Sequence, residues 1–379
     1  MKEINISTVI AAKRHERNIT QDELAEYMSV SKASVSKWET GQSYPDITFL
    51  PRLAAYFNIS IDELIGYLPQ MTAEDIKKNY NRLAHDFSSK PFEEVYAECR
   101  ELVKKYYACF PLVFEIAALL LNHHPLAKEP EKQQEILNEI IRLCEHIKTD
   151  GDDLWLSKQA NSMQAICYLT LQKPLEVLEL LEGSTKPVMS TEVILSGAYQ
   201  MKGDSKKAAT VMQVGVYQYL GILLSLAPSY LSLYMKDGRF DPLLARFLKV
   251  AEVFDFDRLR PDLLAPIYYV AALTYATNQN AEKTLEMLAG YERVCTSASF
   301  AVELHGDQYF DLLDDWLEEN ELNKSVPRDI KLIRQDVINI IKNNPAFTFL
   351  AQNPVYQNIL NHLEGALFMK GWSSYGKID

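Results

Sequence analysis

Two short amphipathic segments joined by only three residues stand near the start of the chain, in TQDELAEYMSVSKASVSKWETGQ from Thr20 to Gln42. Thr20 and Glu23 form a Thr-x-x-Glu capping box, which fixes where the first segment begins as a helix. Ser31 is a suitable N-cap for the second segment, KASVSKWE, and Gly41 ends it. Because three residues are too few to join an ordinary pair of packed helices, this spacing predicts a helix-turn-helix unit.

The neighbouring segments complete a small domain of five helices. An apolar stripe predicts a helix before the quoted stretch, and the basic patch of Lys13, Arg14 and Arg17 lies at its end. Pro51 lacks an N–H and suits the first turn of a helix, which places the fourth helix start near Thr48. Another capping box, formed by Ser60 and Glu63, predicts a last short helix. We therefore expect a domain over residues 1–66.

The third helix has an outward face without acidic residues, although the chain has a net charge of −12. A helical wheel puts Val35 and Trp38 on the inner side. The outward side holds Lys32, Ala33, Ser36 and Lys37. A helix of this kind suits the major groove of DNA, which lies between two phosphate backbones.

The residues quoted also resemble the lambda repressor/Cro-like (XRE) family of DNA-binding domains. The match extends over ITQDELAEYMSVSKASVSKWETGQ and FLPRLAAYFNISIDELIG, in gapless register across both helices. The resemblance implies that base edges are read by Lys32, Ala33 and Lys37, with Ser36 a weaker candidate. It implies that phosphates are held by Gln21, Ser34, Gln42 and Ser43. It further implies a structural ion pair between Arg14 and Glu39, which ties the first helix to the third.

The domain itself is not basic, since residues 1–66 hold seven basic and nine acidic residues. One copy should therefore bind DNA weakly, because phosphate contacts need positive charge. A homodimer on two half-sites of double-stranded operator DNA is the natural remedy. The alternative is a helical domain that uses this surface for protein contacts, with both lysines merely solvated.

Residues 67–90 are predicted to be a linker with a connecting helix, and residues 91–379 a series of paired helices without strands. LSGAYQMKGDSKKA, from Leu195 to Ala208, resembles a tetratricopeptide (TPR) repeat. LSLYMKDGRFDPLL repeats the signature at Tyr234 and Gly238, and weaker copies surround Tyr168 and Tyr275, at steps close to the length of that repeat. The fold class predicted is all-α, with the helix-turn-helix domain followed by an α-solenoid that dimerises and senses a ligand.

The arrangement of domains resembles the RRNPP peptide-pheromone receptors, which implies a short peptide as a possible ligand. From the register of the repeats, the groove candidates are Asn161, Gln164 and Tyr268. One alternative is a groove filled by the chain's own C-terminal segment from Asn353. Two others are a regulator without a ligand and a protein-interaction scaffold, in which the solenoid only dimerises or recruits a protein partner.

Motifs of catalysis are missing: the sequence contains no HExxH, GxGxxG, GxxxxGK[ST] or GxSxG. We therefore expect no enzyme, no catalytic residue, no cofactor and no metal site. The five cysteines form no CxxC pair and are typical of reduced, buried thiols in a cytoplasmic protein. The longest apolar run, residues 219–235, is interrupted by Pro228 and predicts buried helices rather than a membrane span.

Overall fold

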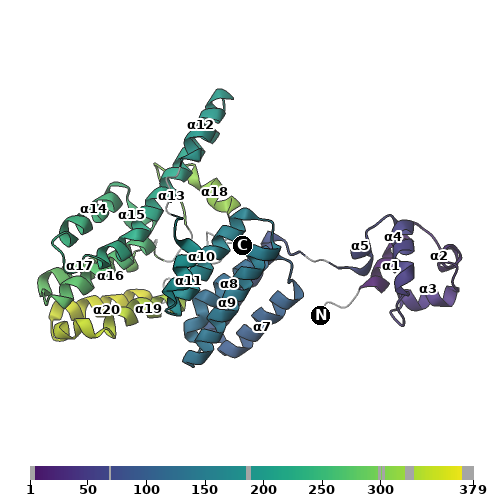
Figure 1. The fold of residues 1–379 in the computed structure, drawn as a ribbon, viewed down its shortest axis with the longest axis horizontal. Helices are drawn as coiled ribbons and strands as arrows, with labels where there is room; N and C mark the ends of the chain where they lie inside the picture. The colour runs from purple at the N-terminus through teal and green to yellow at the C-terminus, as the bar shows by residue number, and fades with distance from the viewer. Residues whose placement is uncertain are drawn as a thin grey trace. The chain divides into compact units, whose positions relative to one another are not determined.

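The structure is a computed structural model that describes residues 5–67, 70–184, 189–297, 300, 304–320 and 328–368. Every regular element in these ranges is an α-helix or a short 3-10 helix (Figure 1). The predicted all-α fold class is confirmed. The chain divides into two compact units: unit 1 comprises residues 1–83 and 90–182, and unit 2 comprises residues 84–89 and 183–379. The division falls inside the segment that we expected to be one solenoid.

The first part of unit 1, here called the head, contains five helices and one 3-10 turn. They are α1 (Ile6–Glu16), α2 (Gln21–Met28), α3 (Lys32–Glu39), the turn Ile47–Phe49, α4 (Leu50–Phe57) and α5 (Ile61–Ile65). The capping box of Thr20 and Glu23 is present in both directions, as predicted. Ser31 accepts a hydrogen bond from the N–H of Ser34, and Ser60 accepts one from the N–H of Glu63.

The head has a hydrophobic core of its own, which explains why such short helices are stable together. Each of the five helices contributes to it. The buried members are Ile6, Ile10, Leu24, Ala25, Met28, Val35, Trp38, Leu53, Ala54, Phe57 and Leu64.

After the head, unit 1 continues as a series of longer helices. They are α6 (Ala73–Ser89), whose last six residues are assigned to unit 2, α7 (Phe92–Lys105), α8 (Phe110–His123), α9 (Pro130–Asp150), α10 (Leu154–Thr170) and α11 (Pro174–Leu181). Neighbours in sequence pack on one another, with α9 in contact with both α8 and α10. This is the nearest-neighbour packing expected of a helical repeat.

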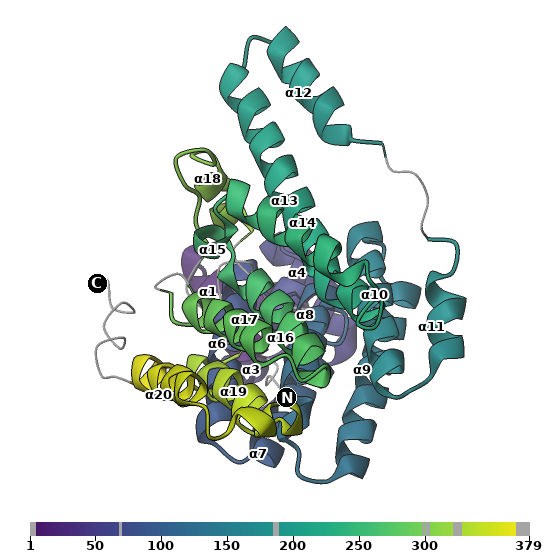
Figure 2. The same ribbon diagram turned by 90° about the vertical axis from the view of Figure 1, so that its left-hand side faces the viewer.

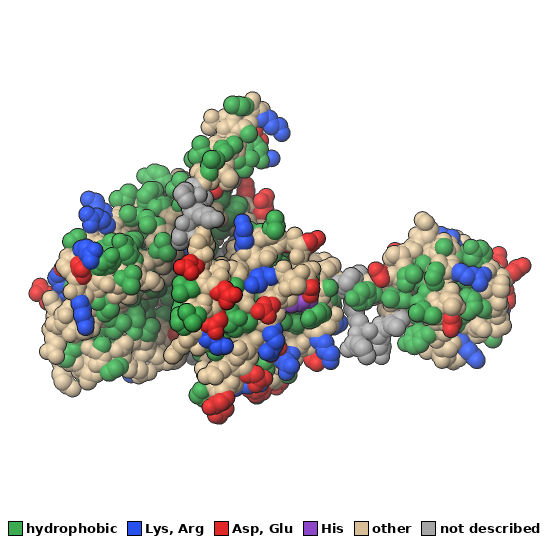
Figure 3. Space-filling view, in the orientation of Figure 1, with side chains coloured by type: hydrophobic (Ala, Val, Ile, Leu, Met, Phe, Trp, Pro, Cys, Tyr) green, Lys and Arg blue, Asp and Glu red, His purple; other side chains and the backbone are tan. Residues whose placement is uncertain are grey.

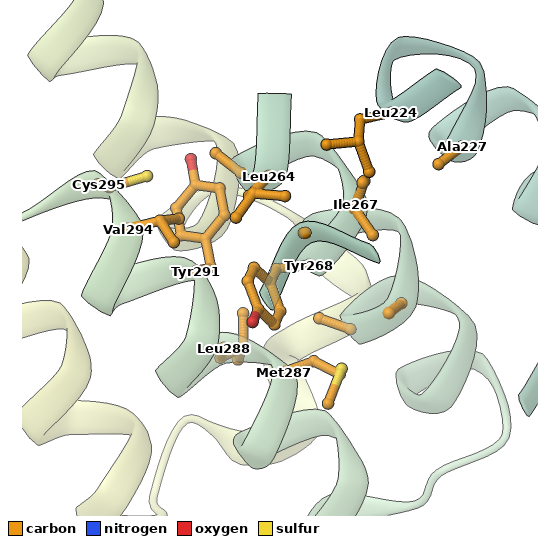
Figure 4. Close-up of a cluster of buried hydrophobic side chains, with 14 of the residues drawn as sticks. Leu224, Ala227, Leu264, Ile267, Tyr268, Met287, Leu288, Tyr291, Val294 and Cys295 are labelled. Carbon is orange, nitrogen blue, oxygen red and sulfur yellow. The ribbon is translucent and has the colours of Figure 1, made fainter. Parts of the chain in front are cut away.

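Unit 2 holds the remaining helices. They are α12 (Thr191–Met201), α13 (Ser205–Ser232), α14 (Phe240–Val253), α15 (Phe256–Leu259), α16 (Pro261–Thr277), α17 (Ala281–Cys295), α18 (Leu313–Glu319), α19 (Ile330–Lys342) and α20 (Pro354–Phe368). Its core is centred on the pair α16 and α17 (Figure 4). The C-terminal helix α20 belongs to this core, since Tyr356, Ile359 and Leu363 are buried in it.

Three of the predicted repeats are helical hairpins: α10 with α11, α12 with α13, and α16 with α17. The repeat around Tyr234 differs from them, because α13 runs unbroken for 28 residues. It is the second helix of one hairpin and the first helix of the next. Pro228 lies inside this helix and does not interrupt it. The expectation that residues 219–235 are buried is correct for only one side of α13. Leu224, Ala227 and Leu231 are buried, whereas Ile222, Leu226 and Leu233 are exposed.

Candidate nucleic-acid interface

The turn between α2 and α3 is short because one residue reverses the chain. Ser29 adopts a left-handed conformation, with φ 59°, directly after α2 ends. Ser31 then caps α3, and its hydroxyl lies 2.9 Å from the hydroxyl of Ser34. The local sequence thus supplies both the stop of one helix and the start of the next.

The residues expected to read bases lie on the solvent side of α3. Lys32, Ala33 and Lys37 are exposed, and Ser36 is half-buried. Val35 and Trp38, on the opposite side, are buried in the core of the head. The described surface of the head carries both basic and acidic side chains (Figure 3). The face of α3 therefore stands out by its lack of acids and not by a strong positive charge.

Lys32 is held by an acidic residue of the preceding helix. Its ammonium donates to the carboxylate of Asp22 across 2.6 Å, and both side chains are about three-fifths exposed, at 60% and 62%. An exposed pair of this kind is weak, so DNA can compete for the ammonium. The sequence analysis missed this pair, although opposite charges on two helices joined by a tight turn are a usable signal for it.

An ion pair joins α1 to α3 beneath this surface. Arg14 donates from Nε to Glu39 Oε1 across 2.6 Å and from Nη2 to Glu39 Oε2 across 3.2 Å. Both side chains are shielded from water, with 11% and 7% exposed. A third hydrogen bond runs from Arg14 Nη1 to the carbonyl oxygen of Ile19 across 2.7 Å. Arg14 and Glu39, which we expected to pair, are therefore within bidentate bonding distance.

Gln21 completes this network at the start of α2. Its amide Nε2 donates to Glu39 Oε2 across 2.7 Å. Burial raises the pKa of Glu39, but hydrogen bonds from Arg14 and Gln21 outweigh burial and hold it below its ordinary value. Glu39 is thus a carboxylate near neutral pH and fixes the side chain of Gln21. The second N–H of that amide stays available for a phosphate oxygen.

The other expected phosphate residues follow α3 in a tight turn. Gly41 has φ 72°, a conformation that favours glycine. The N–H groups of Gln42 and Ser43 both donate to the carbonyl oxygen of Lys37, across 2.9 and 3.2 Å. This turn fixes the backbone at Gln42, whose side chain is exposed.

The groove candidates of unit 1 form hydrogen bonds with side chains of the neighbouring helix α9. Gln164 is only 2% exposed, and its Oε1 accepts from the ammonium of Lys148 across 2.5 Å. The same ammonium lies 3.2 Å from Asn161 Oδ1, and Gln164 Nε2 donates to Glu145 across 3.1 Å. These amides therefore hold α9 and α10 together, which the periodicity of the sequence could not reveal.

Tyr268, the groove candidate of unit 2, lies between α16 and α17 (Figure 4). It is 9% exposed, and its hydroxyl accepts a hydrogen bond from Arg293 across 2.9 Å. Its ring packs where Gly290 leaves room for it. In this structure Tyr268 is an interhelix packing residue.

A cavity of 370 Å³ opens elsewhere in unit 2, and sequence reasoning did not find it. Its wall is mainly apolar. The lining residues are Met212, Gln213, Val216, Val253, Phe254, Asp307, Tyr309 and Phe310. They come from α13, the end of α14 and the segment before α18, which are distant in sequence. Among the residues that the structure describes, no group of three or more His, Cys, Asp or Glu side chains could hold a metal ion.

Comparison with known proteins identifies the type of domain that the head forms. The helix-turn-helix family matches residues 10–64. The HTH-type transcriptional activator BcrR of Enterococcus faecalis is 37% identical over 71 residues, which make up 17% of this chain and 35% of that protein. The chain thus matches about a third of the length of this relative.

Two solved structures align over most of the chain. The apo form of the competence regulator ComR from Streptococcus vestibularis aligns with 86% of this chain and 99% of its own, at 15% identity and a TM-score of 0.24. PlcR from Bacillus thuringiensis, solved in complex with the peptide PapR7 and DNA, aligns with 94% of this chain and 99% of its own, at 16% identity and a TM-score of 0.20. Scores this low do not establish a shared arrangement of the helices.

The short turn, the caps of α2 and α3, the buried inner face of α3 and the family match agree with one another. Residues 10–64 of this chain match the helix-turn-helix family and form a domain of that type.

Proposed function

We propose that this chain is a sequence-specific DNA-binding transcription regulator that acts through α3. The observation that carries the proposal is the exposed face of α3 formed by Lys32, Ala33 and Lys37, to which α3 itself adds no acidic side chain, within a helix-turn-helix domain. Lysine ammonium groups suit the O6 and N7 acceptors of guanine, and the methyl group of Ala33 suits a thymine methyl.

The parts around α3 have a positioning role in this proposal. Phosphate contacts from Gln21, Ser34, Gln42 and Ser43 set the depth and register of α3 in the major groove. Glu39 holds the amide of Gln21 in place before DNA arrives. Less side-chain freedom is then lost when the complex forms.

A homodimer in the cytoplasm is the proposed active species. The head has more acidic than basic residues, so one copy makes too few favourable phosphate contacts for tight binding. Two linked heads on a two-fold symmetric operator bind with a combined affinity that neither head reaches alone. The half-sites would lie about one helical turn of DNA apart.

A genomic pull-down with the full-length chain tests the proposal. We expect the recovered fragments to share one motif, and a Lys37→Ala variant to lose it. Lys104, which is exposed on α7, provides the matched control variant Lys104→Ala, which should recover the same motif as the wild type. Fragments without any common motif would favour the alternative of a protein-interaction scaffold.

We further propose that a short peptide ligand binds unit 2 and biases the arrangement of the two heads. The supporting observation is the cavity of 370 Å³, since pockets for small ligands typically enclose about 300–1,000 Å³. Asp307 in its wall and the acidic chain as a whole favour a ligand with a positive group. Asn161 and Gln164 could contribute only if the contacts with Lys148 open.

Calorimetry on the full-length chain with peptides encoded near its gene tests the ligand. We expect binding that is lost on Phe254→Ala, which removes an aromatic part of the cavity wall, and retained on Val355→Ala, a change on α20 outside the cavity lining. No heat with any peptide would favour the regulator without a ligand. In the alternative of a groove filled by the C-terminal segment, truncation before Asn353 should expose that groove. The same truncation also removes α20 from the core of unit 2.

A further inference from the structure

The turn between α7 and α8, residues 106–109, holds the segment that leads from the head into α6. We call it the anchor turn. The side-chain amide of Gln70 donates from Nε2 to the carbonyl oxygen of Ala108 across 3.1 Å. The N–H of Met71 donates to the sulfur of Cys109 across 3.4 Å. All of these groups belong to unit 1, so the chain is attached to the helices of that unit just before α6 begins.

His146 of α9 contacts the anchor turn. Helix α9 lies beside α8 and α10 in both ribbon views (Figures 1 and 2). The ring nitrogen Nε2 of His146 lies 2.9 Å from the carbonyl oxygen of Tyr107, and the two rings stack with centroids 3.9 Å apart. Phe110, at the start of α8, packs edge-on against the same imidazole. The side chain of His146 is only 10% exposed. One shielded imidazole thus joins the anchor turn to α9.

The hydrogen bonds of this imidazole require a particular protonation state. Its other nitrogen, Nδ1, lies 2.7 Å from a carboxylate oxygen of Asp150. A carbonyl oxygen and an ionised carboxylate only accept hydrogen bonds, so both ring nitrogens of His146 have to donate. A neutral histidine ring has one N–H and one bare nitrogen, and only the imidazolium donates from both. The geometry therefore calls for the charged ring.

The charges around His146 are consistent with an imidazolium. Besides Asp150, the face of the Tyr107 ring attracts a cation, and so does the C-terminal end of α9. The basic residues of the helices packed here are Arg142, one turn earlier on α9, Lys105 at the end of α7 and Lys158 of α10. All three are exposed, so solvent screens their repulsion. The attractive contacts are the close and shielded ones.

We propose that His146 is a pH-dependent clamp, which holds the anchor turn and with it Gln70 and Met71. The charge of a histidine ordinarily changes between about pH 5 and pH 8. When the pH rises and the ring releases its proton to water, one bare nitrogen faces an acceptor, and one of the two hydrogen bonds is lost. The clamp is therefore closed at lower pH and opens as the pH rises.

The clamp bears on how far the head can move. Each residue that leaves the anchor turn lengthens the connection between the head and α6. In a dimer with one head on DNA, a longer connection lowers the effective concentration of the second head at its half-site. Rising pH should therefore weaken operator binding. This consequence rests on the proposed function, whereas the clamp itself does not.

Hydrogen exchange of the full-length chain without DNA tests the clamp. Exchange is followed by mass spectrometry from about pH 5 to about pH 8 and corrected for the intrinsic effect of pH on amide exchange. We expect the protection of residues 70–71 and 106–109 to fall on the order of tenfold towards the upper end, because a charge-assisted hydrogen bond is lost. Amides of α16 and α17, in the core of unit 2, are the internal reference and should keep their protection.

Two variants separate the clamp from a merely structural contact. His146→Gln cannot titrate, so the protection of residues 70–71 and 106–109 should no longer depend on pH. Asp150→Asn replaces a pure acceptor with an amide that donates to a neutral ring, so this variant should keep its protection at the upper end of the pH range. The control is His362→Gln on α20, where another histidine lies beside a carboxylate, that of Glu292. It should show the wild-type profile.

A wild-type profile that does not change with pH would overturn the inference, and so would the same pH dependence in His146→Gln as in the wild type. If glutamine lowers the protection of α9 at every pH, Asp150→Asn decides the matter, because a wild-type profile in that variant would also overturn the inference. None of these readouts involves DNA. Failure to recover an operator motif would contradict the proposed function and leave the clamp standing.

Discussion

Lys32 and Lys37 lie on the same face of α3 but in different surroundings. Lys32 is bonded to Asp22 in the free protein, whereas Lys37 is exposed in the last turn of the helix. The two lysines should therefore contribute differently, because Lys32 must exchange one partner for another when DNA binds. Lys37 only has to lose water.

We expect Lys32→Ala and Lys37→Ala to weaken specific binding by about 1–3 kcal/mol each, with the larger loss at Lys37, and to relax the base preference. Gln42→Ala should weaken binding to all sequences alike, because a phosphate contact carries no base information. Titration of operator and scrambled duplexes by fluorescence anisotropy measures both effects. An unchanged ratio between the two duplexes in both lysine variants would refute the assignment of base readers.

Asp22→Asn should strengthen DNA binding. The change frees the ammonium of Lys32 and removes a negative charge beside the phosphates, and exposed ion pairs are worth about 0.2–1 kcal/mol. A tighter complex with both operator and scrambled duplexes is the expected result in the same titration, with Asp62→Asn on α5 as the control. Weaker or unchanged binding would mean that Lys32 does not contact DNA.

The ion pair of Arg14 and Glu39 should stabilise the head above acidic pH. The pKa of Glu39 is lowered in the folded state, so its contribution is present above the ordinary carboxyl pKa and is lost as pH falls through the folded value. Glu39→Ala leaves Arg14 shielded without its partner and should cost roughly 3–5 kcal/mol near neutral pH. Hydrogen exchange of the α1 and α3 amides should be measured from pH 7 downward. The difference in amide protection between the variant and the wild type should shrink as the pH falls. A constant difference would contradict this account.

At the scale of elements, the contact between α16 and α17 depends on a residue without a side chain. A Cβ atom at Gly290 would lie 2.4 Å from Cε1 of Tyr268. We expect Gly290→Ala to destabilise unit 2 by about 1–3 kcal/mol, because the ring must move within a packed core.

Gly365→Ala on α20 is the matched control, since a Cβ atom there would meet nothing within 4 Å. It should be neutral or stabilise the chain by up to about 1 kcal/mol, as expected for alanine in a helix. Thermal unfolding followed by circular dichroism compares the two variants. Equal melting temperatures would show that the fit of Tyr268 against Gly290 does not matter.

The elements that the sequence predicts best are those defined by local signals. Thr20, Ser31 and Ser60 mark helix starts because capping depends on residues within one turn. The continuity of α13 through Pro228 could not be predicted in this way, because packing of the surrounding helix outweighs a local breaker. The repeat register predicts that Asn161 and Gln164 face a groove. It could not reveal their bonds to Lys148, because Lys148 lies on another helix and periodicity gives no information about contacts between helices.

At the scale of the whole molecule, the proposed function places DNA binding in the head and ligand binding in unit 2. The outward face of α3 carries no acidic side chain of its own, although Asp22 of α2 bonds to Lys32 beside it. The sequence predicts the need for a dimer through the charge balance of the head. It does not predict the exposed apolar side of α13, because the expectation of a buried apolar run was met on only one side of that helix.

The central claim is that α3 reads a DNA sequence, and selection of bound sites from random duplexes tests it most directly. The full-length wild type should enrich a motif with two-fold symmetry, its half-sites about one helical turn apart. The Lys37→Ala variant, run in parallel, should enrich a motif with a relaxed preference at one position of each half-site. A wild-type pool without any motif, or the same motif at full strength from the variant, would contradict the claim.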